Sequence, residues 1–143
     1  MKLNKSIFRE YDIRGTYPSE INEDSIAKIG QAIAVKCTQE GVSEICVGRD
    51  GRLSGKTLLE AMCRSLSESG IAVIDIGLVT SPILYYAAKK NKSKSGVMIT
   101  GSHNPKNDNG IKMVINDKPV SGKEILSLTK SINGVNNKAE IIN

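Results

Sequence analysis

Short apolar runs alternate with amphipathic helical segments along most of this 143-residue chain, and this alternation constrains the fold more than any other feature. Runs rich in apolar and β-branched residues predict strands at 44–50, 71–77 and 96–100. Apolar residues at helical spacing predict helices over 22–40 and around 58–66, and Ser81-Pro82 predicts the start of a third. Strands that alternate with helices of this length are typical of βαβ units covered on both faces.

The second half of the chain departs from this alternation. The connection 101–110 has no helical pattern, so we expect 111–115 to return as an antiparallel edge strand. The helical spacing of Ile125, Leu128, Thr129 and Ile132 predicts a last helix over 121–132. The expected fold is α/β: a three-layer α/β/α sandwich with a mixed, mostly parallel sheet of about four strands, the last antiparallel. We expect one domain over 1–132 and a linker over 133–143, leading toward a second domain.

Composition excludes several classes of protein. Aromatic residues make up 3% of the chain, tryptophan is absent and Lys and Arg form no stripe, so the net charge of +5 does not indicate nucleic-acid binding. No apolar stretch is long enough for a membrane span. Cys37, Cys46 and Cys63 lack CxxC spacing and fall in apolar patterns, which favours reduced thiols in a cytoplasmic protein.

The stretch "GRDGRLSGKT" at 48–57 is close to a phosphate-binding P-loop. The motif G-x-x-x-x-G-K-[ST] would require glycine at position 50, where this chain has Asp50. A loop counted from Gly51 is one residue too short, and one counted from Gly48 is two residues too long. A glycine-rich turn with Ser54 as a helix cap is the favoured interpretation, and nucleotide binding is the weaker alternative.

The loop "GSHNP" at 101–105 follows a predicted strand directly and contains the only histidine of the chain. A hydroxyl such as that of Ser102 is a useful nucleophile when a neighbour takes its proton and other groups balance developing charge. His103 adjoins it, Lys112 lies on the next predicted strand, and Arg14 lies in an N-terminal segment that we expect across the strand ends.

Two other interpretations of the loop remain open. A serine hydrolase is disfavoured, because the sequence has no G-x-S-x-G elbow and basic groups around a serine suit phosphate chemistry better. The loop can also be an ordinary turn, in which serine and asparagine bond to the local backbone.

Three motifs in order, "FREYDIRG" (8–15), "VGRDGRLSG" (47–55) and "GVMITGSHNPKNDNGIKM" (96–113), resemble the first domain of the α-D-phosphohexomutases. The form "TGSHNP" resembles the phosphomannomutase/phosphoglucomutase branch, since phosphoglucosamine mutases usually carry alanine where Gly101 stands. The resemblance covers nearly the whole chain.

The resemblance implies that Ser102 is a phosphoserine that exchanges its phosphoryl group between the 1- and 6-positions of a mannose or glucose phosphate, through a bound bisphosphate. It also implies that Lys112 and Arg14 assist proton transfer, while Tyr11, His103 and Asn104 bind substrate. The Ser102 phosphate would ligate Mg²⁺, an oxygen-preferring cation.

Family members have three further domains, which carry the other metal ligands and the sugar- and phosphate-binding loops. No such motifs occur in this chain. We therefore expect the remaining mutase domains as partners and the chain alone to be inactive, because the substrate would not be enclosed. The alternative is a stand-alone, non-catalytic module that binds phosphosugar or protein. Arg49, Asp50 and Arg52 also match the family, either within the site or as ion pairs that pin the loop.

Overall fold

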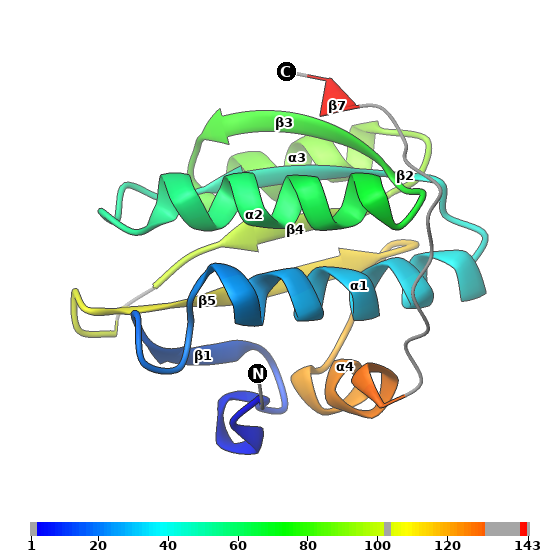
Figure 1. Cartoon of the computed structure of the whole chain (residues 1–143). Coiled ribbons are helices and arrows are strands. Elements are labelled where there is room, and N and C mark those ends of the chain that lie inside the picture. The colour runs from blue at the N-terminus through cyan, green and yellow to red at the C-terminus, as the bar shows by residue number, and fades with distance from the viewer. Residues whose placement is uncertain (1–2, 102–103, 131–140, 143) are drawn as a thin grey trace.

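A computed structural model describes residues 3–101, 104–130 and 141–142 of the chain. Its helices cover both faces of one sheet (Figure 1). The helices are the 3₁₀ turn η1 (Lys5–Ile7), α1 (Glu23–Gln39), α2 (Gly55–Glu68), α3 (Ser81–Lys90) and α4 (Gly122–Thr129). The strands are β1 (Ile13–Thr16), β2 (Glu44–Arg49), β3 (Ala72–Leu78), β4 (Gly96–Ile99), β5 (Asp108–Ile115), β6 (Lys118–Pro119) and β7 (Ile141–Ile142).

The expected three layers are confirmed. α1, α2 and α4 lie over one face of the sheet, and α3 lies on the other (Figure 1). The larger core lies under the first three helices and contains Ile111, Met113 and Ile115 of β5, as their alternation predicts. The smaller core lies under α3 and contains Cys46, Leu84 and Met98. Among the described residues, no helix has the length and apolar character needed to cross a bilayer.

The expected sheet of about four strands is too small. In the described part of the chain the order is β1-β5-β4-β2-β3-β7, with β6 paired to β5. Three strand pairs are parallel, namely β2–β3, β2–β4 and β3–β7, and three are antiparallel, namely β1–β5, β4–β5 and β5–β6. The described sheet therefore has as many antiparallel as parallel pairs, whereas a mostly parallel sheet was expected. β5 is antiparallel as expected, but β1 pairs with its outer side, so β5 is not the edge strand.

Local sequence accounts for where the first helix begins and ends. The Asn22 side chain accepts a hydrogen bond from the Ser25 N–H at 2.8 Å, and the Ser25 hydroxyl accepts one from the Asn22 N–H at 2.9 Å. This reciprocal cap satisfies N–H groups that a helix start leaves free. Gly41 follows the helix with φ +73°, as expected for a glycine that ends a helix.

The chain from residue 133 onward was expected to be a linker. Most of it lies outside the described residues, but Ile141 and Ile142 are in register with Val73 and Ile74 of β3. The proposed boundary at residue 132 therefore remains a prediction, and the described end of this segment lies in the sheet.

Candidate active site around the 101–108 loop

The loop after β4 lies where the carboxyl ends of β2 and β4 meet, the usual position of a binding site in an open α/β sheet. The Asp50 N–H donates to the Ile99 carbonyl at 3.0 Å, and the Thr100 N–H donates to the Gly110 carbonyl at 2.9 Å. These bonds join the start of the loop to β2 on one side and to β5 on the other. Ser102 and His103, the predicted nucleophile and its neighbour, lie outside the described residues.

Arg14 lies on β1, directly opposite Gly110 of β5. Its side chain is 2% exposed, and one terminal nitrogen donates to Asp12 Oδ2 at 2.8 Å. The other terminal nitrogen, Nη1, and Nε are buried and have no hydrogen-bond partner among the described residues. Burying donors of a charged group without acceptors is unfavourable, so this guanidinium is suited to an anionic ligand.

Lys112 lies on the same face of the sheet as Arg14. It is paired with Met98, whose side chain packs under α3, and paired residues of antiparallel strands project to the same side. Gly110, two residues earlier on β5, also belongs to this face and is opposite Arg14. The structure thus puts on one face the two cations to which the family resemblance assigns proton transfer, and Lys112 is half-buried.

Glycine at position 110 allows this approach of β1. A Cβ atom built on Gly110 would overlap the Ile13 carbonyl oxygen and lie 3.1 Å from Arg14 Cα. Both are main-chain atoms that cannot rotate away. Arg14 can therefore take this position because Gly110, the residue opposite it, has no side chain.

Asn104 and Tyr11, two of the predicted substrate-binding residues, lie in different settings. The Asn104 side-chain nitrogen donates to Asp108 Oδ2 at 3.2 Å, across the loop. Tyr11 is 82% exposed in the turn before β1, which the Arg9 N–H closes by donating to the Asp12 carbonyl at 2.9 Å. Asn104 is thus engaged within its own loop, whereas the Tyr11 side chain is open to solvent.

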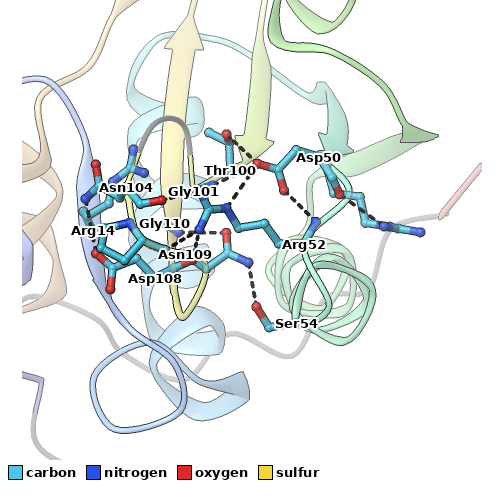
Figure 2. Close-up of polar contacts among 12 residues, drawn as sticks. Arg14, Asp50, Arg52, Ser54, Thr100, Gly101, Asn104, Asp108, Asn109 and Gly110 are labelled. Carbon is cyan, nitrogen blue, oxygen red and sulfur yellow. Dashed lines mark hydrogen bonds and ion pairs between the residues drawn. The ribbon is translucent and has the colours of Figure 1, made fainter.

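Asp50 and Arg52 hold the loop by hydrogen bonds, whereas the ion pair between them joins the two residues to each other. Asp50 binds the loop entrance, and the Arg52 guanidinium reaches across to main-chain oxygens at the exit (Figure 2). Arg49 is different, because its terminal nitrogen donates to the neighbouring Asp50 carbonyl at 3.2 Å.

Sequence patterns did not reveal a second connection, between the start of α2 and the start of β5. The fully buried Asn109 donates from its side chain to the Ser54 hydroxyl at 2.8 Å (Figure 2). Ser54 precedes α2 but makes no side-chain cap hydrogen bond, so the expectation that it caps the helix is wrong. No periodicity could have indicated this contact, because it joins residues 55 positions apart.

The described residues of this chain do not form a metal site. Among them, no three His, Cys, Asp or Glu side chains cluster as metal ligands would. Two carboxylates at the loop already accept hydrogen bonds. Asp50 accepts from Thr100 and Gly101, and Asp108 accepts from Thr16 and Asn104. A group of three such side chains that could hold Mg²⁺ is therefore not found in the described part of the chain.

Comparison with known proteins agrees with this architecture. Residues 5–138 match the family described as phosphoglucomutase/phosphomannomutase, alpha/beta/alpha domain I. Among curated proteins, the phosphoglucomutase of Neisseria gonorrhoeae is 46% identical over 126 residues, which are 88% of this chain and 27% of that protein. The phosphomannomutase/phosphoglucomutase of Pseudomonas putida is 45% identical, also over 88% of this chain and 27% of that protein.

Solved structures give the same result. A phosphoglucomutase/phosphomannomutase family protein of Burkholderia thailandensis superposes with a TM-score of 0.92 at 32% identity, covering 98% of this chain and 33% of that one. A structure described as a putative phosphomannomutase of Thermus thermophilus, 22% identical with a TM-score of 0.79, shares the fold. The chain spans about a quarter of the length of the curated relatives and a third of these structures. It therefore belongs to the phosphoglucomutase/phosphomannomutase family and corresponds to its α/β/α domain I.

Proposed function

We propose that this chain is the nucleophile-bearing domain of a phosphohexomutase, which moves a phosphoryl group between the 1- and 6-positions of mannose or glucose phosphate. The observation that carries the proposal is the buried Arg14 guanidinium, two of whose nitrogens lack an acceptor among the described residues. It lies on the face that also carries Lys112, and Gly110 opposite it bonds to Thr100 at the loop entrance. A phosphate at this place would supply the missing acceptors.

In the proposed reaction the phosphate on Ser102 is attacked by a hydroxyl of the sugar. The bond between phosphorus and the serine oxygen breaks as a bond between phosphorus and the sugar oxygen forms. The proton of the sugar hydroxyl passes to a base, and the serine oxygen is left able to accept a proton. Lys112 is our candidate for the group that takes the proton from the sugar hydroxyl and returns one to the serine oxygen. Arg14 is our candidate for the group that balances the phosphate charge. After the sugar reorients, Ser102 takes back the other phosphate by the reverse steps.

Mg²⁺ would add charge neutralisation at the phosphate. In our proposal the Ser102 phosphate supplies one ligand, and the rest come from the remaining mutase domains, the expected partners of this chain. We also propose that the chain alone does not complete the mutase cycle, because a cleft that excludes water needs walls from those domains. The three buried free cysteines support the proposed cytoplasmic location.

The experiment that tests the proposal is a chimera in which this chain replaces the matching part of the Neisseria gonorrhoeae phosphoglucomutase. We expect it to convert glucose 1-phosphate to glucose 6-phosphate with Mg²⁺, and peptide mapping to find one phosphate at Ser102. Ser102→Ala is the matched control and should show neither. A phosphate mapped to another residue, or a folded chimera without activity, refutes the proposal. Saturable binding of hexose phosphate without phosphorylation at Ser102 would instead indicate the non-catalytic module.

A further inference from the structure

The residues Asp50 and Arg52, from the turn after β2, bind both ends of the segment 100–108. Asp50 holds the entrance: its Oδ2 atom accepts from the Thr100 hydroxyl at 2.8 Å and from the Gly101 N–H at 3.0 Å. Its Oδ1 atom accepts from the Arg52 N–H at 3.2 Å. One carboxylate therefore fixes the start of the loop and the turn that carries Arg52.

Arg52 holds the exit of the loop. One terminal nitrogen donates to the Asn104 carbonyl at 2.7 Å, and the other donates to the carbonyls of Asp108, at 3.1 Å, and Pro105. The acceptors are main-chain oxygens on both sides of the tight turn that the Asp108 N–H closes with the Pro105 carbonyl at 2.9 Å. Hydrogen bonds from a charged donor are stronger than neutral ones, and the planar fork of arginine fixes several acceptors at once.

The position of the guanidinium is itself restricted. Arg52 Nε lies 3.8 Å from Asp50 Oδ2, and the side chain is 15% exposed. A Cβ atom built on Gly101 would overlap the guanidinium, so the present position of Arg52 requires glycine at 101 (Figure 2). The contacts of Asp50 and Arg52 at the base of the loop therefore depend on one another and on glycine at position 101.

We propose that Asp50 and Arg52 are positioning residues for phosphoryl transfer, because they fix the main chain on both sides of Ser102. This inference rests on the proposed function, in which Ser102 carries the phosphoryl group. Transfer requires the reacting oxygen close to its productive position, and main chain held at Gly101 and at Asn104 would favour this. Neither residue needs to touch the substrate for this role.

The first measurement is hydrogen exchange of the full chain, followed by mass spectrometry of the peptide spanning 100–110. We expect Arg52→Ala and Asp50→Asn to raise exchange in this peptide by about tenfold, because each removes charge-assisted hydrogen bonds to the loop. Peptides from α1 and α2 should keep their protection, which shows that the variants fold. Arg64→Ala is the matched control, since Arg64 is an exposed arginine on α2. Exchange at 100–110 as slow as in the wild type overturns the proposal.

The second measurement is the rate of phosphate uptake at Ser102 from hexose 1,6-bisphosphate, in the chimera described above. We expect Arg52→Ala to slow uptake by about tenfold or more, with little change in the half-saturating concentration of bisphosphate. Arg52→Lys keeps the charge but not the fork, so it should restore only part of the rate. Millimolar ethylguanidinium should partly rescue Arg52→Ala and leave Arg64→Ala unchanged.

The outcomes separate the two proposals. If the wild-type chimera never takes up phosphate at Ser102, the proposed function fails, and the positioning role fails with it. If the wild type takes up phosphate and Arg52→Ala does so equally fast, the proposed function stands and the positioning role is refuted. Slow uptake together with raised exchange at 100–110 and chemical rescue supports the positioning role.

Discussion

Replacing Gly110 with alanine tests whether close approach of β1 to β5 determines the position of Arg14. The added methyl group would overlap the Ile13 carbonyl oxygen and lie 3.1 Å from Arg14 Cα, so β1 must move away. Overpacking of this kind costs about 1–3 kcal/mol. Ile13, which is fully buried, would also lose part of a burial worth about 1.5–3 kcal/mol.

We therefore expect Gly110→Ala to lower the free energy of unfolding by about 2–4 kcal/mol. For a chain of this size that corresponds to a melting temperature lower by about 6–12 °C. Urea and thermal denaturation followed by circular dichroism measure both quantities. Gly51→Ala is the matched control, since a Cβ atom there would meet no other atom within 4 Å. If Gly110→Ala stays within about 0.5 kcal/mol of the wild type, the steric reasoning is refuted.

Three further predictions concern other parts of the molecule. Ser54→Ala leaves the buried Asn109 amide without its acceptor and should cost about 1–3 kcal/mol in urea denaturation; a neutral effect would mean that another acceptor takes its place. Burial raises the pKa of the Cys37 and Cys63 thiols from 9.0 to about 12. As the pH rises, these thiols therefore ionise at a lower pH in the unfolded chain than in the folded one. Their contribution to stability is complete below pH 9 and is lost as the pH rises toward 12, by up to about 1.4 kcal/mol per pH unit for each thiol. Thermal denaturation across this range checks the slope, and a Cys37→Ala variant with an equally steep slope contradicts the prediction. Lys112→Met should slow phosphate uptake at Ser102 in the chimera by about a hundredfold with an unchanged melting temperature; an unchanged rate would remove Lys112 from the mechanism.

The elements that the sequence predicted are those whose local signals agree with their burial. α1 has a cap at Asn22, a regular apolar stripe and Gly41 after its end, and it forms where expected. β2 and β4 are continuous apolar runs, as strands buried on both faces are. In these segments local preference and tertiary packing favour the same structure.

The missed strands lack such local signals. β1 reads Ile-Arg-Gly-Thr, which shows no apolar alternation, and it is a strand because β5 pairs with it. β7 has two residues, Ile141 and Ile142, and depends on β3 in the same way. Strand structure that comes only from a distant partner cannot be read from a local pattern.

Some features of the candidate site could be predicted from the sequence and others could not. Motif resemblance and strand order together indicated that Arg14 and Lys112 lie near the loop, and the structure puts them on one face of the sheet. The contacts of Arg52 with main-chain carbonyls were not predictable, because they depend on the conformation of residues 104–108 rather than on their side chains. The bond between Asn109 and Ser54 is of the same kind.

The pairing of β1 with β5 also has a consequence for the order in which the molecule can assemble. Residues 13–16 find their partners only at 108–111, so a ribosome must make almost a hundred further residues before Arg14 can reach its place. The α1–α2 contact and the β2–β3 pair join segments closer in sequence and can form earlier, since short loops close at a lower entropic cost. The face that carries Arg14 would then form after these earlier elements, and a nascent chain would already be partly structured before Arg14 reaches its place.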